Sequence, residues 1–163
     1  VTFKGKTIFD VLLLSVDEAI DFFGEQHSIL KKLKPLQDVG LGYIALGQSS
    51  NTLSGGEAQR VKLASYLIST STKDHKFFVF DEPTTGLHFH DIKKLLKAFN
   101  QLVDEGNTIV VVEHNLDVIK CADWLIEMGP DAGDKGGQIV FEGIPEDLAN
   151  QNTETAKFLK KKL

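Results

Sequence analysis

The sequence predicts an α/β fold, in which a mostly parallel sheet is covered by helices. Two unbroken runs of apolar, β-branched or aromatic residues, 77–80 and 108–112, are bounded by polar residues, which is typical of strands buried on both faces. Between the runs, apolar side chains recur on one helical stripe at Ile92, Leu95, Leu96, Phe99 and Leu102. Strand, amphipathic helix and strand in this order indicate an α/β core.

The rest of the chain divides around that core. Apolar residues recur at helical spacing through residues 11–36, and a turn-rich stretch containing Gly40, Gly42 and Gly47 follows. Two more strands are expected at 124–128 and 138–143, separated by a glycine-rich turn at 129–137, and short helices are expected from Pro145 onward. We therefore expect a mainly helical part over residues 1–52 and an α/β part over residues 53–163.

Composition excludes several classes of protein. The 163 residues include 18 basic and 23 acidic side chains, for a net charge of -5, whereas a self-contained nucleic-acid binder usually has a basic face. The single cysteine, Cys121, excludes an internal disulfide and a multi-cysteine zinc site within these residues. The sequence has neither an apolar run long enough to cross a membrane nor a signal-peptide pattern, so we expect a cytoplasmic protein with no membrane partner. Because residue 1 is Val1 rather than Met, we also expect that the chain begins inside a longer protein.

The first motif suited to ligand binding is Leu53-Ser54-Gly55-Gly56-Glu57, which lies directly before a helical stretch. Ser54 and Glu57 have the spacing of a capping box, in which each side chain accepts a hydrogen bond from the other residue's backbone N–H. Gly55 and Gly56 leave the first backbone N–H groups of the helix uncovered, and such groups attract anions. The alternative interpretation is an ordinary capped helix after a loop.

The second motif is the pair Asp81-Glu82 at the end of the first apolar run. Ligands of α/β proteins bind at the carboxyl ends of strands. Asp81 is suited to hold Mg²⁺ directly or through water, and Glu82 to orient or deprotonate a water that attacks a phosphoryl group. The alternative is a solvated strand end without chemical function.

Histidines give weaker signals. His114 follows the second apolar run, where it could sense a terminal phosphate, although a lone histidine is more often structural. His88 and His90 do not share a helix face, so a metal pair is a weak interpretation. Gly5-Lys6-Thr7 ends like a phosphate-binding loop, but it lacks the strand before and the packed helix after that such a loop needs.

In order and separation, these motifs resemble those of ABC-type ATPases. Residues 53–57 resemble the signature motif, 78–82 the Walker B segment, 85–88 the D-loop, and His114 the switch histidine. Four longer stretches (39–44, 53–64, 81–88 and 113–120) are similar to the UvrA family, the damage-sensing ATPases of bacterial nucleotide excision repair. The resemblance implies that the chain is the C-terminal part of the second ATPase half, without its phosphate-binding loop.

The resemblance also implies roles for individual residues. ATP would be held in composite sites, with Ser54, Gly55, Gly56 and Glu57 contacting nucleotide bound to the opposite half. Asp81 would hold Mg²⁺ through water, while Glu82 and His114 would be catalytic. Gly86 and His88 of the D-loop would also contact nucleotide.

Partners are implied in the same way. They are the remainder of the ATPase, a second copy of it in a homodimer, UvrB and damaged double-stranded DNA. Zinc would be bound by other parts of the complete protein, since these residues contain no paired CxxC motif. An isolated chain without a phosphate-binding loop is expected to be inactive. Two alternatives remain: an ABC ATPase of transport or translation, and an interaction domain without catalysis.

Overall fold

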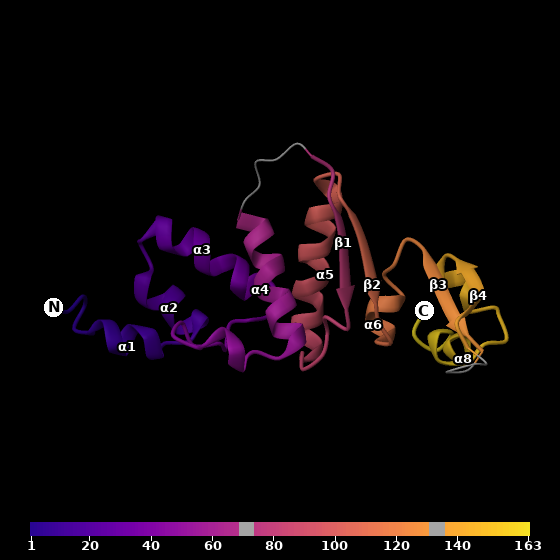
Figure 1. Cartoon of the computed structure of the whole chain (residues 1–163), viewed down its shortest axis with the longest axis horizontal. Helices are drawn as coiled ribbons and strands as arrows, with labels where there is room; N and C mark the ends of the chain where they lie inside the picture. Colours follow the sequence, from indigo (N-terminus) through magenta and orange to yellow (C-terminus); the bar gives the residue numbers. More distant parts are fainter. Residues whose placement is uncertain (69–73, 131–135) are drawn as a thin grey trace. The chain divides into compact units, whose positions relative to one another are not determined.

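A computed structural model describes residues 1–68, 74–130 and 136–163. The chain divides into two compact units, Val1–Val112 and Glu113–Leu163. The positions of these units relative to one another are not determined, so each is described by itself (Figure 1). The division expected after residue 52 stays a prediction.

The first unit begins with the three helices α1 (Ile8–Leu13), α2 (Val16–Phe23) and α3 (His27–Asp38). The first two begin at capping boxes, because Thr7 pairs with Asp10 and Ser15 with Glu18 through side-chain and backbone hydrogen bonds. Apolar residues of α2 and α3 form a small core around Val16, Ala19 and Leu33. The helical spacing of this region therefore predicted its structure.

The loop after α3 is held against α2 by backbone hydrogen bonds. Val16 N–H donates to Ile44 O and Asp17 N–H donates to Gly42 O, both at 2.9 Å. A Cβ at Gly42 would lie 2.3 Å from the Asp17 carboxylate oxygens, so a larger residue here would displace the Asp17 side chain. Contacts with α2 therefore set the position of this loop, and the loop carries Tyr43.

The larger core of the first unit is formed by helices packed on a parallel strand pair. After η1 (Ser50–Thr52) come α4 (Gly55–Ile68), β1 (Phe77–Asp81), α5 (Phe89–Asp104) and β2 (Thr108–Val112). The strands β1 and β2 pair in parallel, from Phe77 opposite Thr108 to Asp81 opposite Val112. Figure 1 shows α4 and α5 on the same side of these strands. The buried residues there are Val39, Leu41, Leu63, Ala64, Leu67, Phe78, Phe80, Leu95, Ala98, Phe99 and Leu102.

Within the described residues of the first unit, the expected burial of the strands on both faces is wrong, because helices cover one face of the strand pair. Phe78 and Phe80 are 9% and 6% exposed on the helix side, whereas Phe77 and Val79 on the other side are 63% and 61% exposed. An unbroken apolar run indicates that both faces of a strand favour apolar neighbours, but it does not say whether the same segment of chain supplies both layers. Among the described residues of the first unit, helices supply one layer.

The second unit contains α6 (Leu116–Ile119), β3 (Leu125–Gly129), β4 (Gln138–Gly143), α7 (Pro145–Leu148) and α8 (Glu154–Leu159). Both expected strands are present, and they pair with each other in antiparallel fashion. The connection over residues 130–137 is too short for the crossover that a parallel pair needs. Residues 131–135 of the expected glycine-rich turn lie outside the described residues.

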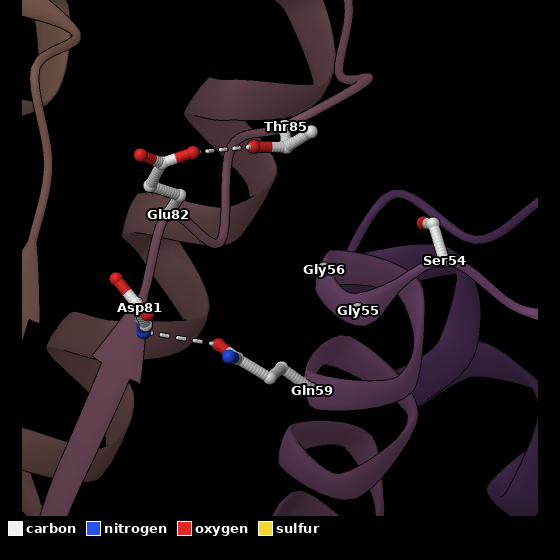
Figure 2. A pocket seen from close by; sticks show the side chains of 7 residues that line it. All are labelled: Ser54, Gly55, Gly56, Gln59, Asp81, Glu82 and Thr85. Atoms are coloured by element: carbon white, nitrogen blue, oxygen red, sulfur yellow. Dashed lines mark hydrogen bonds between the residues drawn. The ribbon is translucent and has the colours of Figure 1, made fainter.

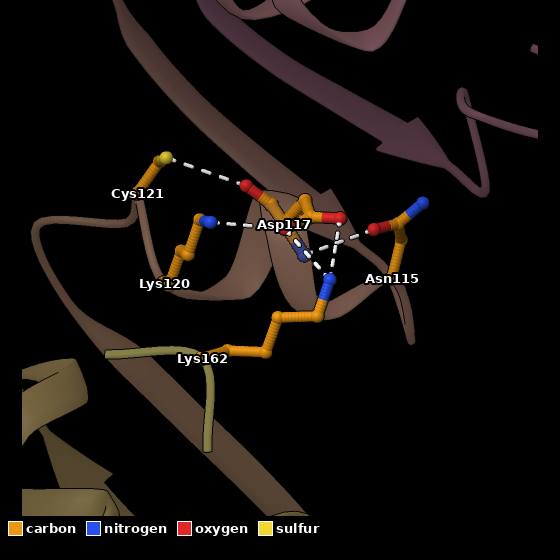
Figure 3. Close-up of polar contacts among 5 residues, drawn as sticks. All are labelled: Asn115, Asp117, Lys120, Cys121 and Lys162. Atoms are coloured by element: carbon orange, nitrogen blue, oxygen red, sulfur yellow. Dashed lines mark hydrogen bonds and ion pairs between the residues drawn. The ribbon is translucent and has the colours of Figure 1, made fainter. Parts of the chain in front are cut away.

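Polar contacts fasten the C-terminal end of the second unit to α6 (Figure 3). Lys162 Nζ lies 3.1 and 3.0 Å from the two carboxylate oxygens of Asp117, and Lys120 Nζ lies 2.9 Å from the same group. The bond from Lys120, followed by that from Lys162, lowers the pKa of Asp117. Asn115 caps α6 by accepting a hydrogen bond from Asp117 N–H at 2.9 Å.

Among residues 1–68, 74–130 and 136–163, no helix is long and apolar enough to cross a membrane.

Candidate functional site

The start of α4 has the capping box that the sequence predicts. Ser54 N–H donates to Glu57 Oε2 at 2.7 Å, and Glu57 N–H donates to Ser54 Oγ at 3.3 Å. A Cβ built at Gly55 would meet nothing within 4 Å. The side chains of Ser54 and Glu57 therefore stabilise this helix start, while the backbone at Gly55 borders open space.

Tyr43 ties the loop after α3 to this helix start, a contact that the sequence analysis missed. Its hydroxyl donates to Glu57 Oε1. This bond, followed by the one from Ser54 N–H, lowers the pKa of Glu57. Burial, followed by the bond to Glu57, raises the pKa of Tyr43. In the sequence, Tyr43 stood out only as part of the 39–44 stretch that resembles the UvrA family. That resemblance did not predict which residue Tyr43 contacts.

The acidic pair lies at the carboxyl end of β1, as expected. Glu82 N–H donates to Val112 O at 2.9 Å and so extends the pairing of β1 and β2 by one residue. The φ angle of Glu82 is +46°, a left-handed conformation that a side chain seldom adopts without support from its surroundings. Its carboxylate Oε2 accepts a long hydrogen bond of 3.4 Å from Thr85 Oγ1.

A pocket of about 290 Å³ joins the two motifs (Figure 2). Gln59 bridges its two sides, because its Oε1 accepts a hydrogen bond from Asp81 N–H at 3.2 Å. In Figure 2 the carboxylates at the end of β1 lie opposite the first turn of α4. The lining residues are Ser54, Gly55, Gly56, Gln59, Asp81, Glu82 and Thr85. The structure therefore brings together five of the predicted site residues with Gln59 and Thr85.

The other predicted site residues lie outside this lining. Glu57 faces Tyr43 and Ser54. Gly86 has a φ of +77° in the turn before α5, and His88 is the N-cap residue of α5. His114 is exposed in the second unit, so its distance from the pocket is not determined; its N–H donates to Glu113 Oε2 at 3.2 Å.

Comparisons with known proteins point to one family. Over 164 aligned residues, covering 100% of the chain, the sequence is 57% identical to UvrABC system protein A of Aquifex aeolicus. It is 56% identical over 98% of its length to the protein of that name from Thermus thermophilus. The chain belongs to the UvrA family. It spans 18% and 17% of the lengths of these two relatives, and a search of family models found no match.

Solved structures agree with the assignment to the UvrA family. The crystal structure of UvrA2 from Deinococcus radiodurans matches 100% of the chain with a TM-score of 0.85 and 45% identity, and the match covers 20% of that protein. A bacterial Atm1-family ABC exporter with ATP bound matches 93% of the chain and 26% of its own, with a TM-score of 0.54 and 20% identity. The second likeness shows the fold alone. The predicted fold class, an ABC-type α/β domain, is confirmed.

The residues of the pocket fit the ligands that the UvrA family implies. Open backbone at Gly55, on the first turn of a 14-residue helix, suits a phosphate group. The exposed carboxylate of Asp81 offers the oxygen ligands that Mg²⁺ prefers. No group of three or more His, Cys, Asp or Glu side chains that could enclose a metal is found in the described ranges.

Proposed function

We propose that this chain forms part of the nucleotide-hydrolysing core of the UvrA ATPase, which recognises DNA damage in bacterial nucleotide excision repair. The pocket that joins the glycine-rich start of α4 to the carboxylates after β1 carries this proposal. The 56–57% identity to two UvrABC system proteins A supports it and gives no support to a role in transport or translation.

In the proposed reaction, Glu82 orients and deprotonates the water that attacks the terminal phosphate of ATP. Asp81 would hold Mg²⁺ through water, and the ion would supply positive charge next to the phosphate oxygens. The open backbone at Gly55, together with Ser54 and the neighbouring Gly56, binds phosphate of the nucleotide held by the opposite ATPase half. Glu57 stabilises this helix start through its bond to Ser54 N–H.

Three further residues complete the proposed site. His114 hydrogen-bonds the terminal phosphate and reports whether it is present, while Gly86 and His88 shape the loop that faces the second nucleotide site. These roles rest on the family motifs, because Gly86 and His88 do not line the pocket and His114 lies in the other unit.

The proposed partners are the remainder of the ATPase, a second copy of it, UvrB and damaged double-stranded DNA, in the cytoplasm. The net charge of -5 supports DNA contact through other parts of the complete protein. Zinc is likewise proposed to be held by those parts.

The test is Glu82→Gln in the complete ATPase, with the other nucleotide site inactivated so that one site is measured. Loss of the general base should lower kcat by about 100-fold or more while ATP still binds. Glu105→Gln, which alters a carboxylate at the far end of α5, is the matched control and should leave kcat unchanged. Hydrolysis and repair at the unsubstituted level in the Glu82→Gln protein would contradict the catalytic role of Glu82.

A further inference from the structure

Arg60 is a buried cation beneath the pocket. It lies on α4 with 1% of its surface exposed. Its Nη1 donates to Pro83 O at 2.7 Å and to Thr85 O at 3.3 Å. Among the described residues, its Nε and Nη2 atoms are buried without a hydrogen-bond partner. A buried guanidinium is costly unless carbonyl oxygens accept its hydrogen bonds, and Arg60 has two such acceptors, Pro83 O and Thr85 O. Arg60 and the 83–85 backbone therefore stabilise each other.

The segment that Arg60 holds carries Glu82. Thr85 N–H donates to Glu82 O at 3.1 Å, which closes a turn, and Arg60 bonds two carbonyl groups of that turn. The left-handed conformation of Glu82 persists only where neighbouring contacts impose it. The bonds from Arg60 are such contacts, because they fix the carbonyls that follow Glu82 in the chain.

The start of α4 packs closely on the same turn. A Cβ at Gly56 would lie 3.3 Å from Arg60 Nη1, 3.5 Å from Thr85 O and 3.6 Å from Glu82 O. The guanidinium nitrogen Nη1 therefore lies beside both the first turn of α4 and the turn that carries Glu82. Its charge also acts on Glu57, whose pKa it helps to lower.

We propose that Arg60 is a positioning residue, which holds the 82–85 turn so that the Glu82 carboxylate faces the pocket. This inference rests on the proposed function. Arginine suits the task because its planar, always charged fork presents several donors in fixed directions. Both bonds come from Nη1, which the rigid guanidinium group holds in a fixed direction. Lysine would keep the charge, but its flexible stem would not hold its ammonium group at this point.

The test is a double-mutant cycle of Arg60→Lys and Glu82→Gln in the complete ATPase, with the other nucleotide site inactivated. If Arg60 acts through Glu82, Arg60→Lys should lower kcat about tenfold alone, with KM changed less than about twofold. In the Glu82→Gln background it should lower single-turnover hydrolysis by less than about twofold. Lys62→Arg, on the exposed side of α4, is the matched control and should leave kcat unchanged.

Each outcome decides the inference. An equal loss in both backgrounds, a change in KM alone or no change in kcat would overturn it. If Arg60→Lys does not fold, Pro83→Ala replaces it, since this change keeps the carbonyl but loosens the turn. A loss of kcat that requires Glu82 would then support the inference, and any other result would overturn it. If Glu82→Gln itself leaves hydrolysis unchanged, the proposed function fails before the cycle is read.

Discussion

Gly55 and Gly56 are neighbours at the start of α4, yet they have opposite surroundings. Gly55 is exposed with nothing within 4 Å of an added Cβ, whereas Gly56 is buried against Arg60 and the 82–85 turn. The sequence predicted that both glycines uncover backbone N–H groups. It did not predict that Gly56 also makes room for a buried guanidinium, because Arg60 and Pro83 are 23 positions apart and no periodicity relates them.

This difference predicts opposite effects of the same substitution. Relative to Gly55→Ala, Gly56→Ala should lower the free energy of unfolding of the chain by about 1 kcal/mol, because its methyl group must displace the buried Arg60 Nη1 whereas both changes share the helix-propensity gain. Gly55→Ala should change it by less than about 0.5 kcal/mol, since that site is open. Urea denaturation followed by circular dichroism measures both. A larger loss for Gly55→Ala than for Gly56→Ala would contradict the packing described above.

Local patterns predicted the elements better than they predicted how the elements meet. The stripe on α5 is buried as expected at Leu95, Phe99 and Leu102, because one helix face repeats every three to four residues. The capping box of α4 could also be predicted, because its two partners, Ser54 and Glu57, are only three residues apart in the sequence. The antiparallel pairing of β3 with β4 depends on the length of their connection, and the contact of Tyr43 with Glu57 depends on the fold of the loop.

The short helix α6 gives a prediction about pH. The pKa of Asp117 is lowered from 3.8 by its bonds to Lys120 and Lys162. A carboxylate with a lowered folded pKa stabilises the fold fully above its unfolded pKa, and that contribution disappears as the pH falls through the lower folded value. Asp117→Asn should therefore be less stable than the unsubstituted chain at pH 7, by a small margin because the lysines are partly exposed.

The difference between the two proteins should shrink as the pH falls below 3.8. Thermal denaturation between pH 7 and pH 3 measures it, with the exposed carboxylate Asp123→Asn as the matched control. A stability difference for Asp117→Asn that stays constant down to pH 3 would show that these ion pairs do not fasten the C-terminal end to α6.

At the scale of the whole molecule, the motifs identified the family because four long stretches of the sequence resemble it and follow one another in the order and separation typical of ABC-type ATPases. The pocket confirms that two of these motifs meet, at the start of α4 and the end of β1. The sequence did not predict the one-sided burial of the β1–β2 pair, on which Val79 and Val112 are 61% and 55% exposed. Among the described residues of the first unit, no element forms the second apolar layer that these side chains favour.

The lack of a complete phosphate-binding loop predicts that the isolated 163-residue chain neither binds ATP tightly nor hydrolyses it. A complete phosphate-binding loop supplies several backbone N–H groups and a lysine to the triphosphate, and the sequence contains only Gly5-Lys6-Thr7 of such a pattern. The pocket supplies the open backbone at Gly55 and the carboxylates of Asp81 and Glu82, but among the described residues its lining includes no lysine to hold a triphosphate. Isothermal titration calorimetry should therefore detect no micromolar binding of MgATP, and no hydrolysis should exceed the buffer rate. The complete ATPase in the same buffer is the positive control, and stoichiometric micromolar binding by the isolated chain would show that these residues form a nucleotide site alone.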